Sequence, residues 1–280
     1  MYGTKSFQNM NNLNVLYHRW KTEQKEFEKQ KILLKQRISS EPVHDIRVST
    51  KKLRSFLKLY ILLKQQPEWE YLFLKTNKLF EVLGKYREIE ICLDLIDNYE
   101  KKMNCNFRQF KNHLHLLIKN SKTWANDEIH RYNAKELAKI ALLLKQDAEL
   151  NNDKTLADKI LQLFEEKIIE SSSYFKQPHK LRQHLKDIYY WEIFFSEEIK
   201  SKCYFKNLHK ILDDLGNWQD RELFSIRMKH FRKDYLPKQF EEYVLLKEFE
   251  KTLAEEKKLQ LKTGISDTRK WLLKIKRKRP

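Results

Sequence analysis

One segment of the chain carries cationic side chains at a spacing that could bind a multivalent anion. Arginine makes two-point contacts with phosphate oxygens, and lysine supplies a mobile point charge. Steps of three and four residues place side chains on one face of a helix. Five side chains follow this spacing: His44, Arg47, Lys51, Arg54 and Lys58. Lys52 widens the same face, and we call these six residues the first stripe.

A second face of the same helix is apolar and could be buried in a core. It contains Val43, Ile46, Leu53, Leu57 and Tyr60. Like charges three or four residues apart destabilise an isolated helix by about 0.3 kcal/mol per pair. A bound anion would offset this repulsion. A solvated surface with counterions is the alternative.

The pattern returns in the second half of the chain. The second stripe consists of His179, Lys180, Arg182 and Lys186. Asp187 and Tyr189 stand where the first copy has Lys52 and Arg54, so the first stripe is expected to bind more strongly. The histidine that opens each stripe could donate to phosphate oxygens or could be a hydrogen-bonded structural residue.

A second pair of matching segments lies downstream of each stripe, at residues 79–93 and 211–225. Gly84 and Gly216 occupy matching places, and Glu88 and Asp220 follow them. The glycines are expected to allow a close helix approach or to mark a kink. We expect the carboxylates to hold stripe residues in position; pairs with solvent-facing lysines are the alternative.

The element pattern predicts an all-helical fold, because the chain has only 4 glycines and 5 prolines. Helices are predicted over residues 2–38, 42–64, 68–99, 107–128, 134–150, 202–232 and 239–262. Further helices are predicted to end near residue 171, to begin near residue 179, and to begin at residue 266 after a break at Thr263-Gly264. The repeat divides the chain into halves, residues 1–130 and 131–280.

The charge balance favours a polyanionic partner. The chain has 57 Lys and Arg against 39 Asp and Glu, a formal net charge of +18. Nucleic acid, an anionic membrane surface and polyphosphate are the candidate partners. The 3 cysteines have neither metal-ligand nor redox-motif spacing. No signal-peptide core or apolar run of 18 residues is present, so we expect a cytoplasmic protein without a membrane span.

At these residues the chain resembles the CHAD family, the conserved histidine α-helical domains. The first signature corresponds to HDIRV at residues 44–48 with KKLR at residues 51–54. Leu83-Gly84 with Arg87-Glu88 is similar to the family's glycine element, with Glu88 in place of Asp. The second copies are HKLR at residues 179–182 with Lys186 and Tyr190, then Leu215-Gly216 with Asp220. The four motifs occur in order and span most of the chain.

The resemblance implies one CHAD domain made of two four-helix bundles, related by a pseudo-twofold axis, with a basic groove between them. It also implies binding of inorganic polyphosphate without catalysis. Storage, granule targeting and regulation of a partner enzyme are the alternative purposes of such binding. Carried over residue by residue, the binding set is His44, Arg47, Lys51, Arg54, His179, Arg182 and Lys186. The stripes add Lys52, Lys58 and Lys180. No cofactor and no metal ion are expected.

Two other function classes fit less well. Phosphoryl-transfer enzymes use metal-binding carboxylate clusters or glycine-rich phosphate loops, and neither is recognisable here. An RNA-binding or general polyanion-binding protein is the alternative, supported by the basic tail KIKRKR at residues 274–279. The tryptophans are expected to be core residues rather than partner anchors: Trp20, Trp124, Trp191, Trp218 and Trp271.

Overall fold

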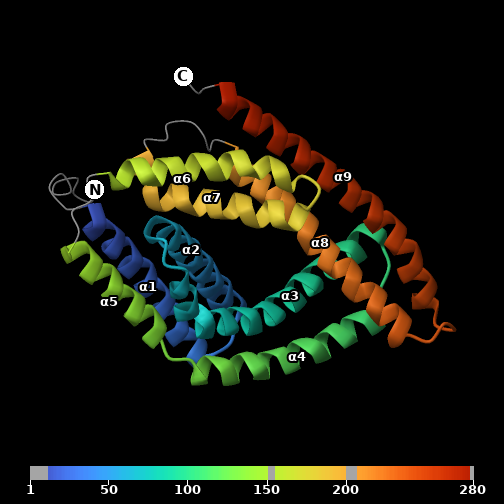
Figure 1. Ribbon diagram of the computed structural model, residues 1–280. Coiled ribbons are helices and arrows are strands. Elements are labelled where there is room, and N and C mark those ends of the chain that lie inside the picture. The colour runs from blue at the N-terminus through green and yellow to red at the C-terminus, as the bar shows by residue number, and fades with distance from the viewer. Residues whose placement is uncertain (1–11, 151–154, 200–206, 278–280) are drawn as a thin grey trace, which may run out of the picture. The chain divides into compact units, whose positions relative to one another are not determined.

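The computed structural model describes residues 12–150, 155–199 and 207–277, and these ranges contain helices and no strands (Figure 1). This confirms the predicted all-helical fold. The α-helices are α1 (Asn12–Gln36), α2 (Ser40–Lys64), α3 (Leu74–Met103), α4 (Arg108–Arg131), α5 (Lys135–Leu150), α6 (Leu156–Glu170), α7 (Pro178–Ile199), α8 (Leu208–Asp234) and α9 (Glu241–Arg277). Two 3₁₀ segments, η2 (Pro67–Phe73) and η3 (Ser171–Tyr174), precede α3 and α7.

Contacts divide the chain into two compact units. Unit 1 comprises Met1–Glu81, Asn126–Glu166 and Tyr190–Ser201. Unit 2 comprises Val82–Ala125, Lys167–Tyr189 and Lys202–Pro280. Each unit therefore draws on both sides of the predicted boundary between residues 130 and 131. The units describe contacts and the predicted halves describe a sequence repeat, so the duplication stays a prediction.

The core of unit 1 fixes α2 through its apolar face. All five predicted face residues are buried: Val43, Ile46, Leu53, Leu57 and Tyr60. Phe56 packs against both Phe194 and Phe195 of α7, with ring centroids 5.4 and 5.8 Å away. Trp191 donates its indole N–H to the carbonyl oxygen of Ser55 at 2.8 Å. One side of α2 is therefore held in the core, as the sequence predicted.

The core of unit 2 is built from α3, α4, α8 and α9. Aromatic rings from each of these helices meet in it, including Tyr99, Phe110, Phe224 and Phe249. Helix α9 lies along α8 (Figure 1). This packing buries a continuous apolar cluster, which is the main source of stability for such helices.

Carboxylates from distant helices satisfy the first N–H groups of α3 and α4. Glu136 accepts from the backbone N–H groups of Lys75 and Thr76, each at 3.1 Å. Glu242 accepts from the N–H groups of Gln109 and Phe110 at 2.8 and 2.9 Å. These N–H groups have no partner within their own helix, and a negative charge at a helix N-terminus is favourable.

The predicted break at Thr263-Gly264 is wrong, because α9 continues through it to Arg277. A Cβ added to Gly264 would lie 2.8 Å from Leu215 Cδ2 of α8, so the glycine allows close helix packing rather than a helix end. Trp124 is also not a core residue, since its side chain is 57% exposed. The predicted break at residues 151–153 lies outside the described residues. Among the described helices, none is long and apolar enough to cross a membrane.

Replacing Gly264 with alanine should destabilise the protein by about 1–3 kcal/mol, because the fully buried Leu215 would have to move. In an exposed helix the same change stabilises by about 1 kcal/mol. Urea unfolding of Gly264→Ala measures the free energy of unfolding, and Thr263→Ala, at an exposed neighbouring position, is the control. A stabilised Gly264→Ala variant would show that α8 and α9 do not pack this closely.

Glu192 on α7 should make stability depend on pH. Burial raises the pKa of its carboxyl from 4.5 to about 8. The native state therefore keeps a proton that the unfolded chain releases, and its contribution to stability is lost as the pH rises from about 4.5 to about 8. Glu192→Gln should gain stability relative to the parent protein over this range, measured by urea unfolding. Glu248→Gln on α9 is the exposed control, and a difference that is flat with pH would contradict the expectation.

Candidate functional site

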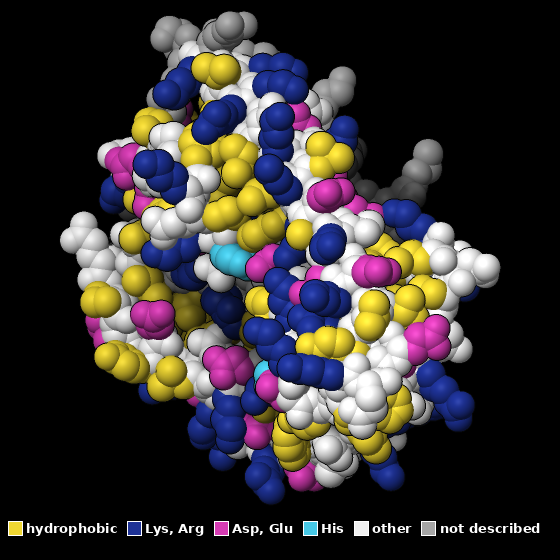
Figure 2. Space-filling model, turned by 90° about the vertical axis from the view of Figure 1, so that its right-hand side faces the viewer, with side chains coloured by type: hydrophobic (Ala, Val, Ile, Leu, Met, Phe, Trp, Pro, Cys, Tyr) yellow, Lys and Arg dark blue, Asp and Glu magenta, His cyan; other side chains and the backbone are white. Residues whose placement is uncertain are grey.

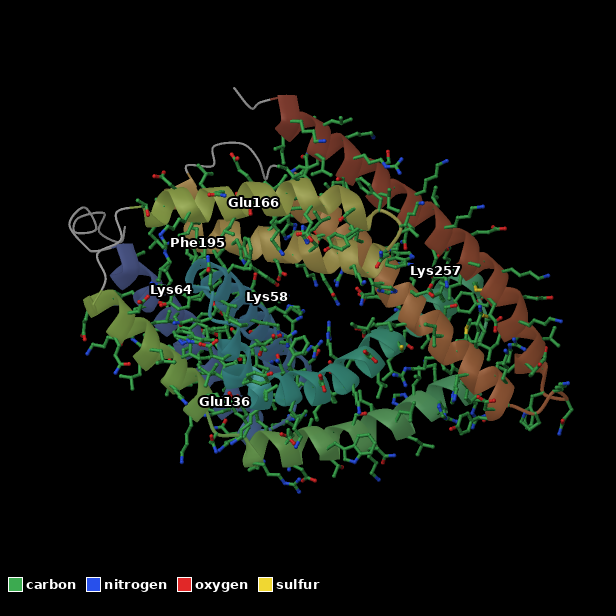
Figure 3. All side chains as sticks on the ribbon, in the orientation of Figure 1. Lys58, Lys64, Glu136, Glu166, Phe195 and Lys257 are labelled. Carbon is green, nitrogen blue, oxygen red and sulfur yellow. The ribbon has the colours of Figure 1, made fainter. Side chains whose placement is uncertain are left out.

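Lysine and arginine side chains are prominent on the face drawn in Figure 2, where acidic and apolar side chains are interspersed among them. The first stripe stands out because its members share one helix, α2. His44 and Lys58 are exposed, and Arg47, Lys51 and Arg54 are half-buried. Figure 3 shows Lys58 and Lys64 on this helix. The exposed ends and half-buried middle give an accessible line of cations whose central members are held by neighbouring residues.

The centre of the first stripe converges on the aromatic ring of Phe80 on α3. The guanidinium carbon of Arg47 lies 4.0 Å from the ring centroid, and that of Arg54 lies 4.4 Å away. Lys51 Nζ lies 6.0 Å from the same centroid. Arg47 Nη1 also donates to the Phe80 carbonyl oxygen at 2.5 Å. The structure thus brings three predicted site residues to one ring, and Phe80 itself is not among the residues predicted from the sequence.

Lys52, in contrast, is engaged by a carboxylate. Its Nζ lies 3.1 Å from Glu23 Oε2 on α1, and both side chains are largely buried. In unit 2, Asp187 on α7 pairs with Lys167 on α6 at 3.8 Å. Lys52 and Asp187 occupy matching places in the sequence repeat, and each pairs with the preceding α-helix. Each ion pair thus joins a stripe helix to the α-helix before it, and the stripe helix supplies the cation in one pair and the anion in the other.

Unit 2 holds the second stripe near the start of α7. Arg182 Nη1 donates to Gln219 Oε1 on α8 at 2.9 Å. A Cβ on Gly216 would lie 3.1 Å from Arg182 Nη2, so the glycine leaves room for the guanidinium. Arg47 and Arg182, which match in the repeat, thus each contact the helix that carries a glycine element. Lys180 is exposed and Lys186 is half-buried.

The histidines of α7 differ in their surroundings. His179 is exposed, and its ring centroid lies 4.8 Å from that of Trp218. His184 is buried and donates from Nε2 to the carbonyl oxygen of Lys167 at 2.6 Å. Burial lowers the pKa of His184, which favours its neutral form. His184 is therefore structural, whereas His44 and His179 remain accessible to solvent.

The carboxylate of Glu88 does not hold a stripe residue, so that expectation is wrong for Glu88. It pairs with Arg227 Nη2 on α8 at 3.4 Å. The pair lies beside the buried thiol of Cys92, whose pKa is raised to about 12 by burial. The reason is geometric, because the partly exposed side chains of Glu88 and Arg227 face each other in unit 2. Repeat position alone did not reveal this partner.

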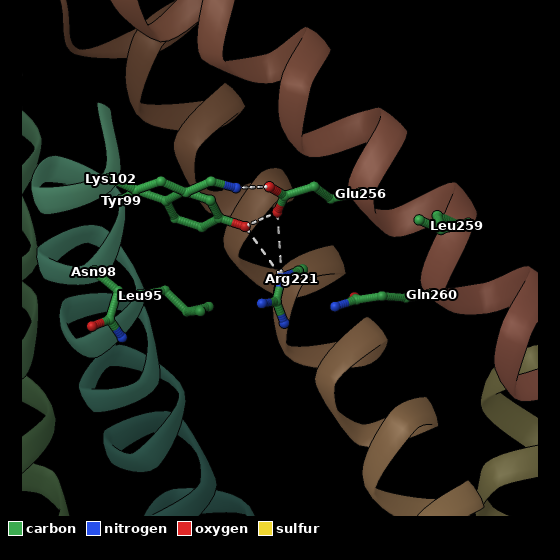
Figure 4. A pocket seen from close by; sticks show the side chains of 8 residues that line it. All are labelled: Leu95, Asn98, Tyr99, Lys102, Arg221, Glu256, Leu259 and Gln260. Carbon is green, nitrogen blue, oxygen red and sulfur yellow. Dashed lines mark hydrogen bonds and ion pairs between the residues drawn. The ribbon is translucent and has the colours of Figure 1, made fainter. Parts of the chain in front are cut away.

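Unit 2 also contains a pocket of about 320 Å³ lined by α3, α8 and α9 (Figure 4). Glu256 pairs with Lys102 at 2.5 Å and accepts from the Tyr99 hydroxyl, and Arg221 Nε donates to that hydroxyl at 3.1 Å. Burial raises the pKa of Glu256, but the hydrogen bonds from Lys102 and Tyr99 outweigh this, and the pKa is lowered. Burial and the Glu256 hydrogen bond raise the pKa of Tyr99 to about 12. A carboxylate thus compensates the cations of this pocket.

Comparisons with known proteins agree with the resemblance in the motifs. A crystal structure of the CHAD domain from the plant Ricinus communis is similar to this chain, with a TM-score of 0.71 and 15% sequence identity. The similarity covers 94% of this chain and 92% of that one. No curated protein matches the sequence. The sequence pattern of the CHAD domain family matches residues 23–228, most of the chain, and the protein therefore belongs to the CHAD domain family.

Proposed function

We propose that this protein binds inorganic polyphosphate through its two stripes and performs no catalysis of its own. The observation that carries the proposal is the line of cations on α2, whose opposite face is buried in unit 1. Membership of the CHAD family supports it, because that resemblance implies polyphosphate binding. We further propose that the protein acts in the cytoplasm, at polyphosphate granules.

The proposed binding set keeps His44, Arg47, Lys51, Arg54 and Lys58 of the first stripe. In the second stripe it keeps His179, Lys180, Arg182 and Lys186. Lys52 receives a different role, because a phosphate would have to compete with Glu23 for its ammonium group. We assign Lys52 to the ion pair between α1 and α2. Asp187 stands at the position that matches Lys52. Because Lys52 is not in the binding set, an aspartate at this position does not remove a binding cation from the second stripe.

Electrostatic attraction would supply most of the affinity. Contacts between cations and a polyanion release condensed counterions, so binding weakens steeply as salt rises. Because α2 rises by about 1.5 Å per residue, its stripe extends for roughly 20 Å along the helix axis. A flexible phosphate chain can follow such a line without presenting bases or sugars. RNA or general polyanion binding is the alternative, and the basic tail, of which residues 278–280 lie outside the described residues, is its candidate site.

Neutralising two central cations should weaken polyphosphate binding. For Arg47→Gln with Lys51→Gln, we expect at least about a tenfold rise in Kd, equivalent to about 1.4 kcal/mol. The dependence of log Kd on log salt concentration should also become shallower, because fewer phosphates are contacted. Fluorescence titration with labelled long-chain polyphosphate at several salt concentrations measures both quantities.

The matched control is Lys274→Gln with Lys276→Gln, which removes the same charge from exposed positions on α9. An equal loss in both double variants would argue against a localised site. Single-stranded RNA of equal total charge provides the second comparison, used as a competitor. Weak competition supports recognition of a bare phosphate chain, and equal competition favours the polyanion alternative.

Substitutions of the adjacent residues Lys51 and Lys52 should have different effects, because we assign Lys51 to ligand binding and Lys52 to helix packing. Lys51→Gln should weaken polyphosphate binding roughly fivefold, since it removes one phosphate contact. Lys52→Gln should instead lower the free energy of unfolding by about 1 kcal/mol, because it leaves the largely buried Glu23 carboxylate without its ion pair. Adding Glu23→Gln should recover part of that loss. Equal losses of affinity at both lysines would return Lys52 to the binding set.

A further inference from the structure

We infer that Phe80 is a positioning residue for the first stripe: its ring engages the guanidinium groups of both Arg47 and Arg54 and orders them for one ligand chain. The inference rests on the proposed binding of polyphosphate and adds a residue that carries no charge. The two guanidinium carbons lie 4.0 and 4.4 Å from the ring centroid, well inside the range of a cation–π contact. Lys51 Nζ, at 6.0 Å, lies at the edge of that range.

The electrostatic problem at this point of α2 is the crowding of like charges. Arg47 and Arg54 are seven residues apart, two helical turns, yet both side chains reach the same ring. The face of an aromatic ring is electron-rich and attracts a cation, and arginine also stacks on it through its flat guanidinium. Phe80 thus offsets part of the repulsion between the two arginines.

Arg47 is held by the same residue in a second way. Its Nη1 donates to the carbonyl oxygen of Phe80, so the ring and the backbone of one residue both engage this guanidinium. Arg47 and Arg54 are half-buried. Side chains already ordered in the free protein lose less conformational entropy when a ligand binds. Phe80 would therefore raise affinity by ordering the cations without adding a contact to the ligand.

This role predicts a distinctive response to loss of the ring. Phe80→Leu keeps every charge and the backbone carbonyl that accepts from Arg47. Polyphosphate binding should weaken roughly fivefold to tenfold, as expected when two long side chains must be ordered on binding. The slope of log Kd against log salt should stay unchanged, because the number of cations is the same. Arg47→Gln should reduce both affinity and slope.

The experiment compares Phe80→Leu, Phe80→Tyr and Tyr71→Leu by titration with long-chain polyphosphate at several salt concentrations. Phe80→Tyr keeps the aromatic face and should bind like the parent protein. Tyr71→Leu removes an exposed ring from η2 and is the matched control. If Phe80→Leu does not fold in thermal unfolding, trifluorophenylalanine at residue 80 keeps the shape and weakens the attraction of the ring face, and it should give the same loss.

A second measurement needs no ligand. In the parent protein, the Nε–H resonances of Arg47 and Arg54 should be shifted by the ring current of Phe80, and Phe80→Leu should abolish the shifts. If the parent protein fails to bind polyphosphate but the shifts are present, the proposed function fails and the positioning role stands. Unshifted resonances, unchanged binding by Phe80→Leu, or a changed salt slope in that variant would each overturn the inference.

Discussion

Burial of the apolar face of α2 is the interaction on which the candidate site depends. Each fully buried aliphatic side chain contributes about 1.5–3 kcal/mol, whereas each like-charge pair on the helix costs about 0.2–0.5 kcal/mol. With five buried residues on that face, packing exceeds repulsion by a wide margin. Unit 1 can therefore keep cations aligned on a helix that would be weakened by them in isolation. Packing aligns the cations along α2, and the ring of Phe80 then orders the guanidinium groups of Arg47 and Arg54.

The two ion pairs show that a residue at a stripe position can serve helix packing rather than ligand binding. Lys52 pairs with Glu23, and Asp187 pairs with Lys167, each joining a stripe helix to the α-helix before it. An ion pair requires opposite signs, but either helix can supply either sign. Asp187 consequently resembles a lost binding residue when the sequence is read alone. In the structure, it takes part in helix packing.

The sequence predicted what depends on local spacing. The helices, the buried face of α2 and the placement of the stripes all follow from periodicity and low glycine content. It did not predict Phe80 or Glu23, because their importance comes from contacts with residues about 30 positions away. The prediction of a helix break at Gly264 was wrong for a related reason. From the sequence alone, a glycine that ends a helix cannot be distinguished from one that makes room for a side chain of a neighbouring helix, here Leu215. Predicting the exposure of Trp124 likewise requires knowing which face of α4 is buried.

The carboxylates at the starts of α3 and α4 bear on the order in which the chain can fold. Glu136 lies 60 residues beyond Thr76, and Glu242 lies 132 residues beyond Phe110. Contacts this distant in sequence form slowly, since a long loop must close first. During synthesis, α4 leaves the ribosome well before the residue that completes its first turn. The packing of unit 2 is therefore completed only once α9 has been synthesised.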